Sequence, residues 1–343
     1  MEEIFSAKCE TTISLYPLTR NCTKSKIRIG DQSAGYLDMA SGQLSPPFPI
    51  SQNGKWGYIG KKGRIVIDPQ FEQAWRFSEG LAPVRIGGRW GYIDRKGKIV
   101  INPQFDLAWD FSEGMAPVKV GGKWGYIDRK GKMVVEAQFD DAWRFSKGLA
   151  RVKVSGKWGY IDRKGNIVIN VQFDVGWRFS EGLAPVMIGD KWGYIDRRGK
   201  IMVNPQFDDC RRFSEGLAPV RIGDKWGYID RKGRIVINPQ FDDAWRFAEA
   251  LSPVMIGDKW GYIDRKGRML INPQFDDAWR FSQGLARVKV GGKWGYIDRK
   301  GRRIIEPKFY DAWDFVEGVA RVKLSGKWGY IDKKGNYVWS PTD

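Results

Sequence analysis

The sequence contains no histidine, and its 343 residues include only three cysteines. Without histidine there is no Ser-His-Asp or Cys-His catalytic pair, no imidazole general base and no histidine-ligated zinc. Cys9, Cys22 and Cys210 lie far apart and form neither a CxxC site nor a convincing disulfide framework. Composition therefore predicts a binding or structural protein and not an enzyme, with no catalytic residue, no cofactor and no metal site.

Long apolar runs are missing as well. No stretch of about 18 apolar residues exists, so no transmembrane segment is expected. The first residues, Met1–Phe5, lack the basic segment and the apolar stretch of a secretory signal. The expected location is therefore the cytoplasm.

Glycine, aromatic residues and positive charge are abundant. There are 42 Gly, 17 Trp, 13 Tyr and 18 Phe, which suggests many tight turns joining aromatic-rich strands. Lys and Arg number 58 against 40 Asp and Glu, a net charge of +18. Residues 1–46 carry equal numbers of basic and acidic side chains, so the whole excess lies in the rest of the chain.

The composition comes from internal repetition. A Trp-Gly pair recurs every 34 residues without insertion or deletion, from Trp56 to Trp328. A second tryptophan series with the same period runs from Trp75 to Trp313 and is broken once, where Cys210 and Arg211 stand.

The period divides the chain into two regions. Residues 47–343 form an array of eight full units and a truncated ninth, which begins at residue 319. Residues 1–46 are interpreted as a leader, 1–23, followed by a degenerate repeat, 24–46, that caps the array. A cap is expected because a terminal repeat has one face without a neighbour.

These motifs resemble those of the WG-repeat (KWG-type) family of mostly bacterial proteins. The resemblance rests on Lys-Trp-Gly-Tyr-Ile-Asp-Arg-Lys-Gly at 123–131 and Phe-Ser-Glu-Gly-Leu-Ala at 179–184. It covers 47–343 well and 24–46 weakly. It implies a β-rich repeat used as an accessory or interaction module, and it brings no catalytic residues to transfer.

The unit 115–148 predicts a three-stranded antiparallel meander. Strands are expected at 115–120, 123–128 and 132–135, joined by Gly-Gly and by an Asp-x-x-Gly turn. Gly125 in the middle strand predicts a close approach, for which a neighbouring aromatic ring is the candidate. The remainder, 138–148, has apolar residues at i, i+3 and i+4 and predicts a helical turn that crosses to the next unit.

Proline in the first strand of most units argues for an edge position and for separate small sheets along an axis. Two all-β architectures satisfy this. The preferred one is an open β-solenoid or superhelix of stacked meanders, because a 34-residue unit is short for a propeller blade and atypical end units suit caps. The alternative is a closed β-propeller with eight or nine blades.

Charge supplies the first candidate site. The two central residues of the Asp-x-x-Gly turn are basic in all nine units: Lys61, Lys62, Arg95, Lys96, Arg129, Lys130, Arg163, Lys164, Arg197, Arg198, Arg231, Lys232, Arg265, Lys266, Arg299, Lys300, Lys333 and Lys334. A regular array aligns them into a track for an anionic polymer or surface. Alternatively, the charges only keep exposed turns soluble, and acidic pairs such as Asp208-Asp209 form an opposing row.

Two further candidates are weaker. Trp and Tyr beside cations could stack on bases or sugars, although strict repeat spacing favours an aromatic core. The irregular unit at Cys210 and Arg211 either opens a pocket or reflects drift in one unit.

The sequence therefore predicts a non-enzymatic scaffold that mediates protein-protein interaction through an extended β surface. The alternative is electrostatic binding of a nucleic acid, an anionic lipid or another polyanion by the basic turns. Neither the partner nor the oligomeric state follows from the sequence.

Overall fold

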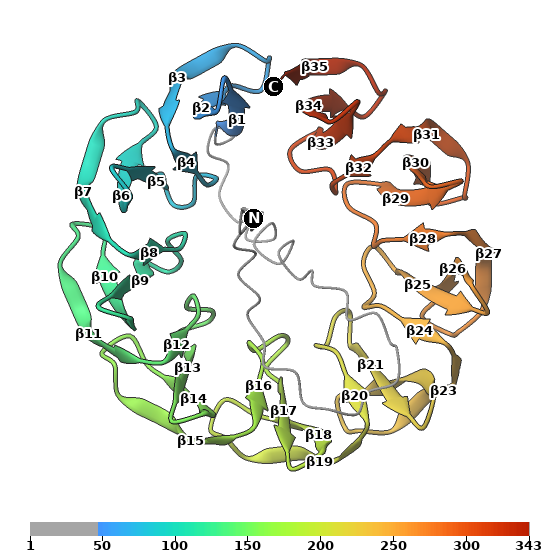
Figure 1. Cartoon of the computed structure of the whole chain (residues 1–343). Helices are drawn as coiled ribbons and strands as arrows, with labels where there is room; N and C mark the ends of the chain where they lie inside the picture. The colour runs from blue at the N-terminus through green and yellow to red at the C-terminus, as the bar shows by residue number, and fades with distance from the viewer. Residues whose placement is uncertain (1–46, 343) are drawn as a thin grey trace, which may run out of the picture. The chain divides into compact units, whose positions relative to one another are not determined.

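The computed structural model describes residues 47–342, so the predicted leader, 1–23, and the degenerate repeat, 24–46, lie outside the described residues. The regular structure of the described chain is entirely β. It comprises nine separate antiparallel sheets, which follow one another around a ring as the blades of a propeller (Figure 1).

Each blade from the second onward has four strands, and the first has three within the described residues. The innermost strands have two residues each: β4 (Gln73–Ala74), β8 (Leu107–Ala108), β12 (Asp141–Ala142), β16 (Val175–Gly176), β20 (Asp209–Cys210), β24 (Asp243–Ala244), β28 (Asp277–Ala278) and β32 (Asp311–Ala312). The next strands outward are β1 (Phe48–Gln52), β5 (Leu81–Ile86), β9 (Met115–Val120), β13 (Ala150–Val154), β17 (Ala184–Ile188), β21 (Leu217–Ile222), β25 (Leu251–Ile256), β29 (Leu285–Val290) and β33 (Val319–Leu324).

The third strands contain the Trp-Gly pairs: β2 (Lys55–Ile59), β6 (Arg89–Asp94), β10 (Lys123–Asp128), β14 (Lys157–Ile161), β18 (Lys191–Ile195), β22 (Lys225–Asp230), β26 (Lys259–Asp264), β30 (Lys293–Asp298) and β34 (Lys327–Asp332). The outer strands are β3 (Ile65–Phe71), β7 (Ile99–Phe105), β11 (Met133–Phe139), β15 (Ile167–Phe173), β19 (Ile201–Phe207), β23 (Ile235–Phe241), β27 (Met269–Phe275), β31 (Arg303–Phe309) and β35 (Tyr337–Thr342).

The predicted hairpins are confirmed. In the third blade, β9 and β10 are joined by Gly121 and Gly122, whose φ values of 56° and 82° give the primed turn that matches strand twist. Asp128 begins the next turn, and its Oδ1 accepts hydrogen bonds from the backbone N–H groups of Lys130 and Lys132, both at 2.9 Å.

Gly125 does meet a close neighbour, but the expected aromatic ring is not that neighbour. A Cβ there would lie 2.5 Å from the carbonyl oxygen of Val135 and 2.8 Å from the backbone nitrogen of Ala137. The outer strand β11 shifts register at this point, so its own backbone bulges over the glycine. In the Trp-Gly pair, the tryptophan therefore supplies a buried indole, and the glycine leaves room for the bulged backbone of the outer strand.

The predicted helical crossover is wrong. The residues after each outer strand form the two-residue inner strand of the next blade, as β12 does beside β13. Each 34-residue sequence unit therefore contributes to two blades. The truncated ninth unit supplies three strands, and the preceding unit supplies the inner strand, so the ninth blade has all four strands. The truncation is therefore not a sign of an open stack.

The prolines of the first strand do not mark an edge. Pro83 lies in β5, which pairs with β4 on one side and β6 on the other. The carbonyl of Pro83 accepts a hydrogen bond from the backbone N–H of Trp75 at 3.0 Å, just beyond the short β4. An N–H group at position 83 would point toward the same neighbour. The carbonyl of Trp75 accepts instead from the hydroxyl of Tyr58 in the preceding blade, at 2.7 Å. A tyrosine thus supplies the hydrogen bond that proline cannot donate.

That tyrosine contact recurs around the ring and joins each blade to the next. Tyr92, Tyr126 and Tyr160 donate in the same way to the residues 17 positions later, at 2.6–2.8 Å. Each of these rings is fully buried, and burial raises the pKa of the phenol. The hydrophobic core is therefore a series of interfaces between neighbouring blades.

The ring closes where the ninth blade meets the first, so the expected open solenoid is wrong and the nine-bladed propeller is confirmed. Ile50 and Ile59 of the first blade pack with Val319 and Tyr330 of the ninth. Tyr330 donates to the carbonyl of Pro49 at 2.8 Å across 281 positions of sequence. We call this interface the seam.

Candidate functional site

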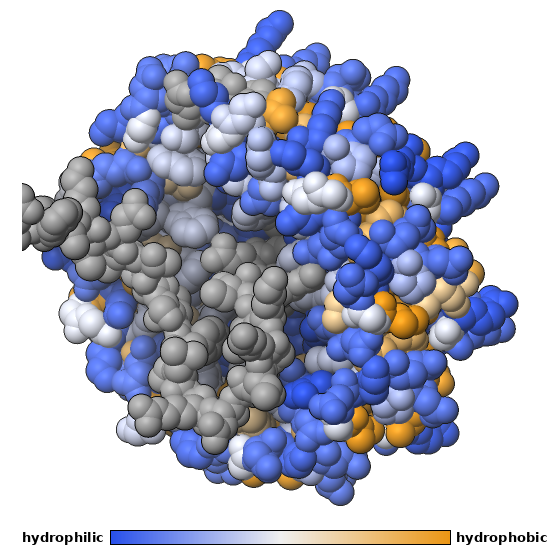
Figure 2. Space-filling view, turned by 45° about the vertical axis from the view of Figure 1, so that its right-hand side comes forward, coloured by the Kyte–Doolittle hydropathy of each residue, from blue (hydrophilic) through white to orange (hydrophobic). Residues whose placement is uncertain are grey.

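The basic turns all lie at one end of the ring. Each links the third strand of a blade to the outer strand, and the nine blades share one topology, so equivalent turns form a circle and not the expected line. The loops that follow the inner strands lie at the same end. Figure 2 shows hydrophilic side chains covering most of the visible surface, with apolar residues in small separate patches.

In several turns the first cation reaches across to the preceding blade. Arg129 Nη2 donates to the carbonyl of Glu79 at 2.7 Å, and Lys333 Nζ donates to the carbonyl of Gln283 at 2.7 Å. Arg163 Nη2 instead lies 3.1 Å from Glu113 Oε2. These cations support the ring, and only part of their charge remains available to a ligand.

The second cation of each turn is exposed and makes no side-chain ion pair within residues 47–342. We call these nine residues the outer cations: Lys62, Lys96, Lys130, Lys164, Arg198, Lys232, Lys266, Lys300 and Lys334. The turns thus combine first cations that contact the preceding blade, seen for Arg129, Arg163, Arg197 and Lys333, with second cations that make no ion pair within residues 47–342.

The opposite end of the ring contains the predicted acidic row, but its carboxylates are engaged. Asp140 accepts from Lys123 Nζ at 2.6 Å and from the backbone N–H of Ser155, in the hairpin of the next blade, at 2.7 Å. Asp208 and Asp242 make the same two contacts. We call this arrangement the carboxylate clamp.

The clamps predict how stability depends on pH. A hydrogen bond from the paired lysine lowers the pKa of Asp140, Asp174, Asp208, Asp242 and Asp276. A carboxyl with a lower pKa in the folded state binds fewer protons there, so its contribution is present above the unfolded pKa and is lost as pH falls through the folded one. We therefore expect the urea midpoint to fall as pH drops below about 4.

Two variants check this prediction by urea unfolding at a series of pH values. Asp242→Asn removes one clamp and should reduce the acid-dependent change. Asp258→Asn changes a carboxyl that is 89% exposed in a nearby hairpin and should leave the change unaltered. Burial raises the pKa of Asp141 and Asp209, so these two carboxyls make the folded state more stable as pH falls. A urea midpoint that rises in acid would show that they outweigh the clamps.

The second tryptophan series forms a circle near the loops, at the end of the ring with the basic turns. Trp109 and Trp143 stack with centroids 6.1 Å apart, and Trp245 and Trp279 with centroids 5.3 Å apart. Six of the seven indoles are half-buried, and Trp75 is 41% exposed. Where two of them stack, each indole covers one face of the other.

Arginines complete this circle, a role that the sequence interpretation missed. Where Arg151 replaces the proline of the first strand, its guanidinium lies 4.2 Å from the ring of Trp143 and 5.6 Å from that of Trp177. Arg287 lies 3.9 Å from the ring of Trp279 in the same way. The signal was visible in the sequence, because arginine stands at three positions where the other units have proline.

The irregular unit makes its own contacts to the next blade. Arg211 takes the place of a tryptophan, with its guanidinium 3.8 Å from the ring of Trp245 and its Nη2 2.8 Å from Asp243 Oδ1. Cys210 is buried beneath it, and burial raises the pKa of the thiol, so the thiol is not activated. The substituted unit keeps the packing of its neighbours.

Within residues 47–342, no three His, Cys, Asp or Glu side chains gather in a metal-binding arrangement. The described part of the chain also contains no helix long and apolar enough to cross a membrane.

Comparison with known proteins identifies the repeat. The family described as WG containing repeat matches eight consecutive segments, at residues 56–90, 90–124, 124–158, 158–192, 192–226, 226–260, 260–294 and 294–328. No curated protein matches the chain.

Solved structures resemble the chain in fold at low sequence identity. A structure described as the eukaryotic initiation factor superposes with a TM-score of 0.63 and 11% identity, over 86% of this chain and 95% of that chain. The dihydro-heme d1 dehydrogenase NirN gives a TM-score of 0.43 at 12% identity, over 86% and 73% of the two chains. Hsv2p from Kluyveromyces lactis gives 0.43 at 9% identity, over 64% and 90%.

Proposed function

Because the chain belongs to the WG-repeat family and its repeats close into a nine-bladed ring, we propose that it is a non-enzymatic scaffold that binds a protein partner with an acidic surface. The observation that carries this proposal is the circle of outer cations. Nine exposed positive charges at one end of the ring attract and orient an acidic surface.

The tryptophan circle favours a protein over a single-stranded nucleic acid. Binding of single strands uses aromatic faces as stacking platforms. Here the faces of Trp109 and Trp143 cover each other, and the guanidinium of Arg151 covers Trp143 toward the next blade. Tryptophan and arginine are common anchors at protein interfaces, and Trp75 of this circle is 41% exposed.

The second candidate is a polyanion, bound through the outer cations alone. Phosphate contacts need no aromatic platform, and the free charges of the turns would supply them. Such binding weakens steeply as salt rises, whereas a packed protein interface is less sensitive to salt.

A matched pair of triple variants tests both proposals. Lys96→Gln, Lys130→Gln and Lys164→Gln together remove three outer cations. The control triple removes the same amount of charge from strands β9, β13 and β29 and consists of Lys119→Gln, Lys153→Gln and Lys289→Gln. We expect the first triple to weaken binding of a protein recovered from cell extract by about tenfold, which is 1.4 kcal/mol, and the control to retain it.

Affinity capture at moderate salt, followed by measurement with the purified partner, provides the readout. Equal loss in both triples would mean that net charge and not the circle of outer cations is responsible. Recovery of nucleic acid alone, released by added salt, would favour the polyanion and overturn the protein partner.

A further inference from the structure

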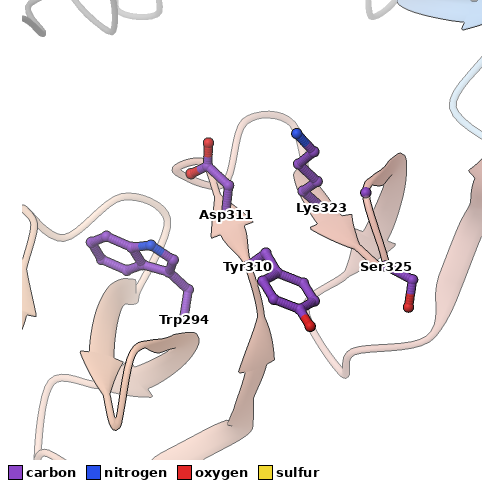
Figure 3. Close-up of a pocket in the computed structure, with 6 residues that line it drawn as sticks. Trp294, Tyr310, Asp311, Lys323 and Ser325 are labelled. Atoms are coloured by element: carbon purple, nitrogen blue, oxygen red, sulfur yellow. The ribbon is translucent and has the colours of Figure 1, made fainter.

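A pocket of about 510 Å³ opens between the eighth and ninth blades, at the end of the ring opposite the basic turns (Figure 3). It is lined by Trp294, Tyr310, Asp311, Lys323, Ser325 and Gly326. Ser325 and Gly326 form the hairpin between β33 and β34, and Tyr310 lies between β31 and β32. The pocket lies where the carboxylate clamp stands in other blades.

Tyr310 replaces the clamp carboxylate. Asp140 follows its lysine by 17 residues and precedes its hairpin donor by 15. The same spacing around Tyr310 leads back to Lys293 and forward to Ser325. The phenol ring cannot accept two charge-assisted hydrogen bonds as a carboxylate does, so both donors of the clamp are left without their usual acceptor.

Neither donor has a hydrogen-bond acceptor within residues 47–342, and the lysine, which is not among the residues lining the pocket, contacts the Tyr310 ring. Lys293 makes no ion pair among the described residues, and its Nζ lies 3.0 Å from the centroid of the Tyr310 ring. The backbone N–H of Ser325 has no acceptor in the described part of the chain, whereas the equivalent N–H of Ser155 donates to Asp140. Tyr310 itself is 58% exposed.

We propose that this pocket binds the carboxylate of an acidic side chain on a protein partner that contacts this end of the ring. Other blades show which groups hold a carboxylate at the corresponding place, because Asp140, Asp174, Asp208 and Asp242 each accept from a lysine and from a hairpin N–H. The proposal rests on the proposed scaffold function for the identity of the partner, and the binding chemistry stands on the pocket alone.

The surroundings favour an acid next to an apolar residue. Lys323 adds a second positive charge, while the negative charge of Asp311 is partly engaged by the backbone N–H of Ala312 at 2.8 Å. Trp294 and Tyr310 supply aromatic surface to its lining (Figure 3). A glutamate or aspartate followed by leucine combines the two features that the pocket offers.

The direct test is NMR of the full chain labelled with nitrogen-15, following the backbone amides of Ser325 and Gly326. The probe is the blocked dipeptide acetyl-Glu-Leu-amide, and its control is acetyl-Gln-Leu-amide. We expect saturable shifts at these two amides with the acidic peptide and binding at least about tenfold weaker with the neutral one. Equal binding of both peptides, or no shift with either, would overturn the proposal.

Acetate distinguishes a peptide site from a general carboxylate site. Acetate carries the same charged group without the apolar neighbour, so it should bind about tenfold more weakly than the acidic peptide. Acetate binding as tight as the peptide would overturn the assignment to a protein side chain and leave a small-carboxylate site.

Three variants locate the effect. Tyr310→Asp restores the clamp within the chain, so it should abolish the peptide-induced shifts and raise the melting temperature. Lys293→Gln should lower the affinity for the acidic peptide by at least about fivefold. Lys225→Gln changes the equivalent lysine of a blade whose clamp is filled by Asp242, and it should leave peptide binding unchanged.

Undiminished peptide binding in Tyr310→Asp would overturn the proposal even if Lys293→Gln failed to fold. These results are independent of the triple variants at the basic turns. A pocket that binds no peptide therefore leaves the scaffold proposal standing. Likewise, failure of the triple variants to change partner binding leaves the carboxylate site standing.

Discussion

Replacing Gly261 with alanine is expected to lower the free energy of unfolding by about 3 kcal/mol or more. The added Cβ would lie 2.4 Å from the carbonyl oxygen of Ile271 and 2.8 Å from the backbone nitrogen of Pro273. Both atoms belong to the backbone of β27, which cannot move aside without breaking its pairing with β26. Equilibrium unfolding in urea, followed by tryptophan fluorescence, measures the change.

Gly257→Ala in the same blade provides the control. Gly257 has a φ of +62°, so alanine there is strained by about 1 kcal/mol, but nothing lies within 4 Å of the added Cβ. The difference between the two variants isolates the close approach of the outer strand. Equal destabilisation would show that the bulge over Gly261 yields easily and that backbone strain is the main cost at both positions.

Placing a charge in the seam is expected to open the ring. Ile59 is fully buried against Val319 and Tyr330, so Ile59→Asp would bury an unpaired carboxylate at a cost of several kcal/mol unless the blades separate. Within the described residues, no segment of chain passes directly from the first blade to the ninth, so non-covalent contacts alone join these two blades. Small-angle X-ray scattering should therefore show a larger radius of gyration than that of the unmodified protein.

Ile161→Asp is the matched control, because Ile161 is equally buried between the third and fourth blades. There the chain itself passes from β11 to β12 and holds the two blades together. We expect this variant to lose stability without a comparable increase in radius. An equal increase in both variants would mean that the seam is no weaker than the other interfaces.

Sequence reasoning predicted the local features well, because each depends on a few adjacent residues. The Gly121-Gly122 turn and the capping of the next turn by Asp128 both follow from residue type. The close approach at Gly125 was also predicted, but its partner was not. That partner depends on a register shift in β11, and the shift leaves no distinct mark in the alternation of apolar residues.

The choice between a ring and an open array could not be made from the period. A 34-residue repeat is compatible with either, and the small rotation between consecutive blades decides between them. That rotation is set by contacts such as the hydrogen bond from Tyr126 to the carbonyl of Trp143, which joins two blades. The tyrosine and the tryptophan were both visible in the sequence, but their pairing was not.

The candidate site was predicted in its residues but not in its division of roles. All eighteen basic turn residues lie where the hairpin pattern placed them. Arg129 and Lys130 look equivalent in sequence, yet only Arg129 reaches a carbonyl 50 residues away. Tyr310 was detectable as a departure from the Phe-Asp motif, but its meaning required the clamp geometry of the other blades.

The offset between sequence unit and blade also governs how such a ring can change in size. Each unit supplies three strands to one blade and the two-residue inner strand to the following one. A gene duplication that inserts one unit therefore adds no free-standing blade, because the new copy takes its inner strand from the old neighbour and gives its own to the next. Gain or loss of a single unit between two blades therefore leaves every junction built from the same parts, and closure of the new ring then depends on the rotation at those junctions.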